Sequence, residues 1–224
     1  MPASVHGPRD LAKRERLDRI RAAATELLLE KDFQSITTRD IARRAGVAEA
    51  TLFRYIKGKQ ELLTMVYGDQ LDAQLSAVEE EDARLVAGRG NAPPTVDSVV
   101  ERIFHIYRRR CEFYQVAPHN ASLYLRQGFE VDRDLSARPV SQGDRTIRLV
   151  ASILAEGQQT GVIDPSVEAA LVAQNLHGTY MHEIDRTPVR GLDPSTLWER
   201  LRPRLEVQLL PLGRPEPSRA PATP

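Results

Sequence analysis

Apolar residues recur at helical spacing along almost the whole chain. Leu17, Ile20, Ala24 and Leu27 form one such stripe and predict a helix over residues 10–30. Similar stripes predict helices over 59–86, 99–107, 113–129 with a break near Pro118, 147–159, 165–185 and 194–210. No segment shows the alternation of apolar and polar residues that is typical of a strand. The pattern therefore predicts an all-α fold.

Between the first two predicted helices the pattern becomes shorter and more specific. Ile41, Ala42 and Ala45 share one helical face, and Gly46 follows, a residue that can take a positive φ and end a helix. A second short helix is predicted over about 49–56, with Leu52 on its inner face. Two short helices joined by a turn that contains Gly are the helix-turn-helix arrangement, which places its second helix in the major groove of DNA.

The segment TTRDIARRAGVAEATLFRYIKGKQELL, residues 37–63, resembles the N-terminal DNA-binding domain of the TetR family of bacterial transcriptional regulators. Three positions depart from the family pattern: Ala48 stands for Ser, Phe53 for Tyr and Ile56 for Phe. The resemblance extends over about residues 10–65, and beyond them only helical layout and length agree. The residues in register with the family pattern are Ile41, Ala42, Ala45, Gly46, Val47, Leu52, Tyr55, Lys59 and Leu62.

Ten residues of this segment are candidates for DNA contact. Thr37 suits the N-cap of the first short helix, although its hydroxyl could instead meet a phosphate. Glu49 could accept from cytosine N4, or it could simply be an acid at a helix N-terminus. The resemblance implies backbone contacts for Tyr55 and Lys59. The full candidate set is Thr37, Thr38, Arg39, Glu49, Ala50, Thr51, Arg54, Tyr55, Lys57 and Lys59.

The charge distribution supports double-stranded DNA as a partner. The net charge of the chain is zero, but residues 1–60 hold 13 Lys and Arg against 8 Asp and Glu, and the remainder holds 18 against 23. Phosphate binding needs a local basic surface rather than a basic whole. A solvated surface with a chance imbalance is the alternative. No apolar run long enough for a membrane span and no secretory signal is present, so no membrane association and a cytoplasmic location are expected.

The sequence predicts a division into five parts. Residues 1–9 are expected to be disordered, 10–58 to form the DNA-binding domain, and 59–87 to form a linking helix. Residues 88–210 are expected to form a helical ligand-binding and dimerisation domain, which begins after the break GRGNAPP. Residues 211–224 contain five prolines and are expected to be a disordered tail.

By resemblance, the second helical region holds an unidentified small-molecule effector. A ligand pocket is mostly apolar with a few polar groups, so aromatic and polar residues within apolar helices are candidates. The alternative is an ordinary core in which each Tyr directs its hydroxyl to the surface. The candidate ligand-binding residues are Tyr107, Cys111, Tyr114, His119, Tyr124, Phe129, His177 and Tyr180.

The last two predicted helices are candidates for a homodimer interface, which the resemblance also implies. Small residues over 169–178 allow close approach of helices, and leucines repeat every four residues over 197–209. Packing within one chain is the alternative. The candidate interface residues are Ala169, Ala173, Leu176, Leu197, Leu201, Leu205 and Leu209.

Catalytic motifs are missing from the sequence. His182-Glu183 is followed by Arg186 where an HExxH zinc motif needs a second His, and neither GxSxG nor a phosphate loop occurs. No catalytic residue, metal site or cofactor is therefore expected. The expected function is a homodimeric repressor that binds a palindromic operator and is released by a small molecule. A regulator controlled by a protein partner is the alternative, and a helical enzyme is a remote one.

Overall fold

The computed structural model describes residues 8–213, and the predictions for residues 1–7 and 214–224 lie outside this range. Within it the regular elements are all helices, and β-structure is limited to one isolated bridge between Ile163 and Gly213, which confirms the all-α prediction. No helix in the described range is long and apolar enough to cross a membrane. The α-helices are α1 Pro8–Glu30, α2 Thr38–Ala45, α3 Glu49–Leu52, α4 Lys59–Arg89, α5 Val96–Val116, α6 Pro118–Arg126, α7 Arg133–Gln159, α8 Ala169–Val189 and α9 Leu197–Leu209.

The chain forms two compact units whose limits differ from the predicted domain boundaries. The first unit comprises Met1–Ala73 and Val116–Val140, and the second comprises Gln74–Gln115 and Ser141–Pro224. Helix α6 and the first two turns of α7 therefore belong with the helix-turn-helix, although they are far from it in sequence. The long helices α4 and α7 each contribute residues to both units.

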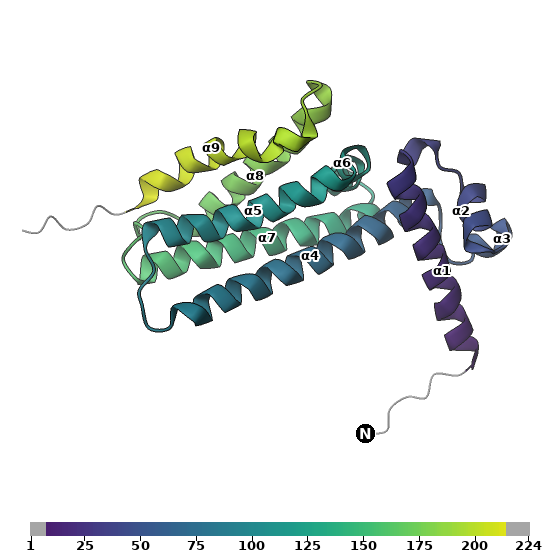
Figure 1. The fold of residues 1–224 in the computed structure, drawn as a ribbon, viewed down its shortest axis with the longest axis horizontal. Helices are drawn as coiled ribbons and strands as arrows, with labels where there is room; N and C mark the ends of the chain where they lie inside the picture. Colours follow the sequence, from purple (N-terminus) through teal and green to yellow (C-terminus); the bar gives the residue numbers. More distant parts are fainter. Residues whose placement is uncertain (1–7, 214–224) are drawn as a thin grey trace, which may run out of the picture. The chain divides into compact units, whose positions relative to one another are not determined.

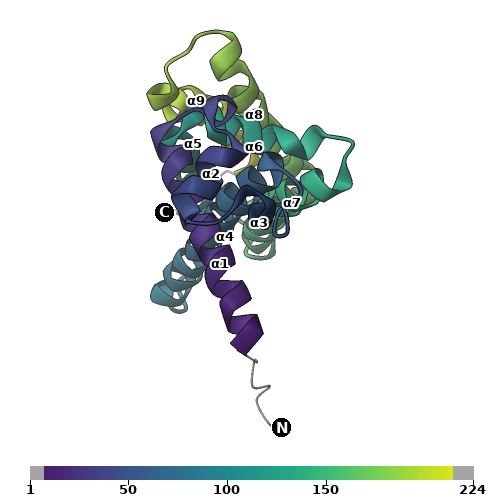
Figure 2. The same ribbon diagram turned by 90° about the vertical axis from the view of Figure 1, so that its right-hand side faces the viewer.

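The first unit has a small core between α1, α2 and α3, which stand together in Figure 2. Ile20 and Leu27 of α1, Ile41 of α2 and Leu52 of α3 are all buried. They are the apolar positions of the predicted stripes, so the pattern correctly identifies the inner face of each helix. Helix α1 begins at Pro8, within the segment predicted to be disordered. Proline is favoured in the first turn of a helix, where its missing N–H costs no hydrogen bond.

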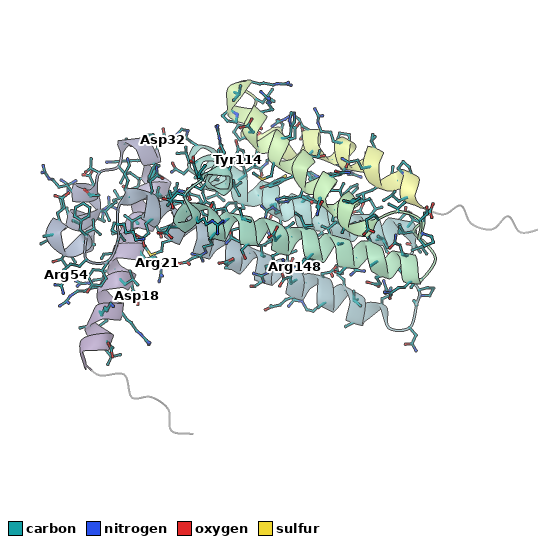
Figure 3. All side chains as sticks on the ribbon, turned by 180° about the vertical axis from the view of Figure 1, so that it is seen from behind. Asp18, Arg21, Asp32, Arg54, Tyr114 and Arg148 are labelled. Atoms are coloured by element: carbon teal, nitrogen blue, oxygen red, sulfur yellow. The ribbon has the colours of Figure 1, made fainter. Side chains whose placement is uncertain are left out.

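An ion-pair network joins three helices of the first unit. The guanidinium of Arg138 on α7 lies 2.6 Å from a carboxylate oxygen of Asp69 and 2.6 Å from one of Asp72, both on α4. Arg21 on α1, labelled in Figure 3, pairs with the other oxygen of Asp69 at 2.9 Å. Gly68 leaves room for this arrangement, because a Cβ there would lie 2.6 Å from Arg138 Nε. The network fixes α1 and α7 to the same surface of α4.

In the second unit the C-terminal part of α4 runs beside α5 and α7, and α8 and α9 lie along the same bundle (Figure 1). The interior is apolar, with Ile103 of α5, Leu154 of α7 and Ile184 of α8 buried. The buried Arg102 of α5 lies in this interior with its charge fully paired. Arg102 binds Asp82 at 2.7 Å and Glu156 at 2.7 Å, so its guanidinium is neutralised from two helices.

Two helices begin at other residues than the sequence predicts. Helix α7 begins at Arg133 rather than near 147, because Asp132 Oδ1 accepts from Asp134 N at 2.9 Å and caps an earlier turn. Helix α8 begins at Ala169 rather than at 165, and its N-cap is Glu168. Residues 165–168 precede it in a turn that Asp164 closes by accepting from Ser166 N at 2.9 Å.

Part of the segment predicted as a disordered tail is ordered. Leu210–Leu212 form a 3-10 turn, and Leu212 O accepts from Asp164 N at 2.9 Å. The same contact brings Gly213 to Ile163 and makes the isolated bridge. The chain after α9 is therefore held against the loop between α7 and α8, at least as far as Gly213.

Candidate functional site

The first short helix of the predicted motif begins with a reciprocal cap. Thr37 Oγ1 accepts from Asp40 N at 3.1 Å, and Asp40 Oδ2 accepts from Thr37 N at 3.1 Å. The Thr37 hydroxyl also donates to Asp40 Oδ2 at 2.7 Å, and this bond keeps the pKa of the Asp40 carboxyl below its usual range. Thr37 is thus the N-cap of α2, and its single O–H is already donated to Asp40.

The turn between α2 and α3 has the predicted geometry. Gly46 takes φ 65° and ends α2 in the left-handed conformation, where any other residue would be strained. Arg44 fixes α2 to α1 by pairing with Glu26 at 3.0 Å and with Glu30 at 2.9 Å. These bonds raise the pKa of the Arg44 guanidinium and lower that of the Glu30 carboxyl.

Glu49, for which the sequence leaves a base contact and a role at the helix N-terminus open, connects the two short helices. Its Oε1 accepts from Thr38 Oγ1 at 2.6 Å, and its Oε2 lies 3.8 Å from Arg39 Nε. Ala48, the N-cap of α3, has no side chain that can cap. The Glu49 carboxylate compensates in part, because a negative charge in the first turn interacts favourably with the helix dipole. We therefore assign Glu49 and Thr38 to positioning α3.

Helix α3 is shorter than the predicted range 49–56. After Leu52 the backbone tightens, and Arg54 N and Tyr55 N bond to the carbonyls of Thr51 and Leu52, three residues back. Ala50 and Arg54 are exposed, and Thr51 is half-buried. Arg54, labelled in Figure 3, therefore lies in the turn that follows α3 rather than on the helix itself.

A basic groove lies between this turn and the N-terminal part of α1. Its volume is about 450 Å³, and it is lined by Ala12, Lys13, Arg16, Arg54 and Tyr55. Within residues 8–213, no ion pair neutralises Lys13, Arg16 or Arg54. The sequence identifies Arg54 and Tyr55 as candidates but not Lys13 and Arg16, because the six basic residues of α1 cannot be ranked without knowing which face approaches α3.

The two lysines of the predicted set are engaged within the first unit. Lys59 Nζ donates to the carbonyls of Phe33 at 2.9 Å, Gln34 at 3.3 Å and Ile36 at 3.0 Å. All three of its N–H groups are used, so Lys59 holds the turn after α1, and we withdraw it as a phosphate ligand. Lys57 pairs with Asp134 at 2.7 Å, but both side chains are largely exposed.

In the second unit, several predicted ligand-binding residues form one buried cluster. Tyr107, Cys111 and Tyr114 from α5 are buried, as is Tyr180 from α8. The Tyr180 ring lies 5.9 Å from those of Tyr107 and His177, measured between centroids. Burial raises the pKa of all three tyrosines, raises the pKa of the Cys111 thiol to about 12 and lowers that of His177 to about 3. The cluster is thus neutral in its side chains, apart from one arginine.

Three other predicted ligand residues do not belong to this cluster. Phe129 is 74% exposed, and His119 is exposed as well, so neither lines an interior site. Tyr124 is buried, but in the first unit, where its ring stacks on Tyr67 at 6.1 Å between centroids. The composition of a helix cannot distinguish these cases, because which face is buried depends on tertiary packing.

The predicted dimer residues are mostly core. Leu197, Leu201, Leu205 and Leu209 are buried within the single chain, as are Ala173 and Leu176, and Ala169 is half-buried. The leucine stripe thus packs α9 into its own unit, which is the alternative considered for the sequence. The outward faces are different: Leu171 and Gly178 are exposed on α8, Val207 is exposed on α9, and Leu210 is exposed in the turn that follows it. A Cβ at Gly178 would meet no atom within 4 Å.

Comparison with known proteins relates the chain to transcriptional regulators. The family described as "Bacterial regulatory proteins, tetR family" matches residues 20–66. The fatty acid metabolism regulator protein of Bacillus subtilis (strain 168) is 24% identical over 171 residues, which are 75% of this chain and 80% of that protein.

Solved structures agree over most of the chain. Thermus thermophilus FadR, described as a TetR-family transcriptional repressor in complex with lauroyl-CoA, has a TM-score of 0.63 and 27% identity and covers 92% of this chain and 98% of its own. The transcriptional regulator FadR from Bacillus subtilis, in complex with stearoyl-CoA, has a TM-score of 0.62 at 21% identity and covers 86% of this chain and 97% of its own.

Proposed function

Because the chain belongs to the TetR family of transcriptional regulators, we propose that it represses transcription as a homodimer on a two-fold symmetric operator and is released by a fatty acyl ligand. Its relatives are regulators and not enzymes. The observation that carries the proposal is the basic groove beside α3, in which cations from α1 and from the end of the motif converge.

Some residues of the motif contact the bases of the operator, and others bind its phosphate backbone. Helix α3 enters the major groove with Ala50 and Thr51 toward the bases, where a methyl group can contact thymine. Arg54, Tyr55, Lys13 and Arg16 bind phosphates on one side of it. Arg39, exposed at the N-terminus of α2, binds phosphate on the other side. Glu49 and Thr38 hold the two helices at a fixed angle.

The homodimer forms through the outward faces of α8 and α9. Leu171 and Gly178 lie seven residues apart on one face of α8, Val207 is exposed on α9, and Leu210 is exposed directly after α9. Exposed apolar residues beside a glycine allow the helices of two copies to approach closely. Two copies then present their α3 helices to half-sites about 34 Å apart.

The ligand class comes from the relatives. One relative regulates fatty acid metabolism, and two solved relatives hold acyl-CoA. The second unit of this chain has a largely apolar interior that includes the buried cluster around Tyr180, which suits a long hydrocarbon chain with a single polar end. Fatty acyl compounds are therefore the effector class that we propose.

Helix α6 can couple the proposed ligand site to the DNA-binding motif, because it directly follows α5 in the chain and is hydrogen-bonded to the end of α1. Helix α5, which carries Tyr107 and Tyr114, ends at Val116, and α6 begins two residues later. Asn120 on α6 bonds to the end of α1, so a shift of α5 is passed to the helix that supports the motif. Ligand binding would change the relative population of two states, and about 1–3 kcal/mol of coupling changes operator affinity several-fold to a hundredfold.

Selection from a random duplex library with purified protein at about physiological salt tests the proposal. Recovery of a two-fold symmetric motif supports a dimeric sequence reader. Recovery of only non-specific duplex, both with and without lauroyl-CoA, would contradict it.

A further inference from the structure

The second unit buries a cation that has no anionic partner. Arg110 on α5 is 2% exposed, and its guanidinium donates to Thr146 Oγ1 on α7 at 3.0 Å. Its Nε has no hydrogen-bond partner, and no carboxylate of residues 8–213 lies within ion-pair distance of it. Arg102, eight residues earlier on α5, shows the usual arrangement of a buried arginine, since two carboxylates neutralise it. Arg110 is therefore an exception within the same helix.

An uncompensated buried charge is expensive for a fold. A guanidinium loses its hydration on burial, and only a counter-charge or strong acceptors restore that free energy. The face of the Tyr180 ring, 4.8 Å from the guanidinium carbon, gives a cation–π contact, which offsets part of the loss. A methionine of similar length would fill the same space without the cost. The burial of Arg110 is thus unfavourable for stability, so a role other than stabilising the fold must explain an arginine at this position.

Two further polar groups without partners surround the same ring. The Tyr107 hydroxyl has no hydrogen-bond partner, and its side chain is 0% exposed. His177 Nδ1 is buried without a partner as well. The Tyr180 hydroxyl is used, because it donates to Arg110 O at 3.4 Å. Three groups capable of donating, from α5 and α8, therefore converge around Tyr180.

We propose that Arg110, Tyr107 and His177 bind the acyl oxygen of the effector. The inference rests on the proposed function, in which that effector is a fatty acyl compound. An acyl oxygen only accepts hydrogen bonds, and Arg110 Nε–H and Tyr107 O–H only need an acceptor. The oxygen belongs either to the carbonyl of an acyl thioester or to the carboxylate of a free fatty acid, and the hydrocarbon chain occupies the apolar interior. A carboxylate would in addition neutralise the guanidinium.

His177 suits this role in its neutral form. Burial is the main cause of its depressed pKa, and the charge of Arg110 adds to it. A neutral imidazole can present N–H on Nδ1 toward an acceptor without adding a second buried charge. Gly143 of α7 approaches the opposite nitrogen, since a Cβ there would lie 3.1 Å from His177 Nε2. The ring is thereby held between α7 and α8.

The test compares three probes that share a twelve-carbon chain: lauroyl-CoA, dodecanoate and S-dodecyl-coenzyme A, a thioether that lacks the acyl oxygen. Binding to the dimeric full-length protein is measured by calorimetry for wild type, Arg110→Met and Tyr107→Phe. Arg108→Met, an exposed neighbour, is the control. We expect Arg110→Met to lower affinity at least tenfold for lauroyl-CoA, for dodecanoate or for both, and to leave S-dodecyl-coenzyme A unchanged. Which of the two oxygen-bearing probes is affected identifies the source of the oxygen.

Thermal unfolding without ligand separates this role from a structural one. If Arg110 serves the ligand, Arg110→Met unfolds at the same temperature as wild type or higher. Tyr107→Phe, which removes a single hydroxyl, gives the same selectivity in a milder form, should the methionine variant not fold. The inference is overturned if both variants bind lauroyl-CoA and dodecanoate as tightly as wild type does. It is also overturned if a variant loses the same affinity for all three probes. Neither result would contradict the fatty acyl class of effector. A wild-type protein that binds none of the probes overturns the fatty acyl class as well.

Discussion

The side-chain oxygen of Asn120 lies 2.7 Å from the backbone nitrogen of Phe33, a residue 87 positions earlier in the chain. The amide nitrogen of the same side chain donates to the carbonyls of Leu28 at 2.8 Å and Lys31 at 3.1 Å. Asn120 thus satisfies the backbone groups at the end of α1 from another helix, which α1 cannot do with its own residues. This contact makes α6 part of the unit that carries the helix-turn-helix.

Replacing Asn120 by alanine is therefore expected to destabilise the first unit. Three hydrogen bonds are lost, and the buried N–H of Phe33 is left without an acceptor, so we expect a loss of about 2–4 kcal/mol in the free energy of unfolding. Urea denaturation followed by circular dichroism measures it. His119→Ala, at the exposed neighbouring position, is the matched control and should change stability by less than about 0.5 kcal/mol. Equal stability of the two variants would show that Asn120 does not hold α1.

The basic groove predicts a specific salt dependence. Arg54→Ala and Arg16→Ala each remove one phosphate contact per half-site. Each should lower the slope of log affinity against log salt concentration by about one unit per half-site. Fluorescence anisotropy with a labelled duplex at several salt concentrations measures the slope. Arg190→Ala, an exposed arginine at the end of α8, should leave it unchanged. A reduced affinity at unaltered slope would mean that Arg16 and Arg54 do not bind phosphate.

A substitution on the outward face of α9 should break the dimer without unfolding the monomer. Val207 is 75% exposed, and Val207→Glu should give monomers that keep their helicity and lose operator binding. Val131→Glu is the matched control, since Val131 is 97% exposed in the first unit. Sedimentation velocity reports the oligomeric state. Leu205→Ala, by contrast, should cost about 2–5 kcal/mol of stability because Leu205 is core. A Val207→Glu protein that stays dimeric would remove this face from the interface.

His177 predicts a pH dependence of stability with a definite sign. Its pKa falls from 6.5 to about 3 in the folded protein, so between these values the unfolded chain binds a proton that the folded chain does not. Stability therefore decreases as the pH falls through this window, by up to about 1.4 kcal/mol per pH unit. His177→Gln should flatten the profile relative to wild type, whereas His182→Gln, exposed on the same helix, should not. Parallel profiles for all three proteins would contradict the burial of His177 as a neutral group.

The sequence is most informative where local chemistry decides the structure. The Thr37 cap, the left-handed Gly46 and the inner faces of α1 and α2 follow from residue type and spacing, and all three are confirmed. These features depend on neighbours within a few residues. The family motif adds the order of the helices, which periodicity alone does not give.

The sequence is least informative where a side chain meets a distant element. Lys59 carries the family position for a phosphate contact, yet its ammonium group is held by carbonyls about 25 residues earlier in the chain. The leucines of α9 look like a dimer seam, because a stripe on a helix does not reveal whether its partner is the same chain or another. Arg110 stands among three arginines in a row, and only packing shows that it is the buried one.

The release of operator by a fatty acyl ligand can be measured in a single titration. A labelled duplex that carries the selected symmetric motif is bound by the wild-type protein, and lauroyl-CoA is added while anisotropy is recorded. We expect operator affinity to fall at least fivefold, which corresponds to about 1 kcal/mol of coupling, and coenzyme A alone to have no effect. Operator affinity that stays constant up to saturating lauroyl-CoA, with ligand binding verified by calorimetry in the same buffer, would contradict it.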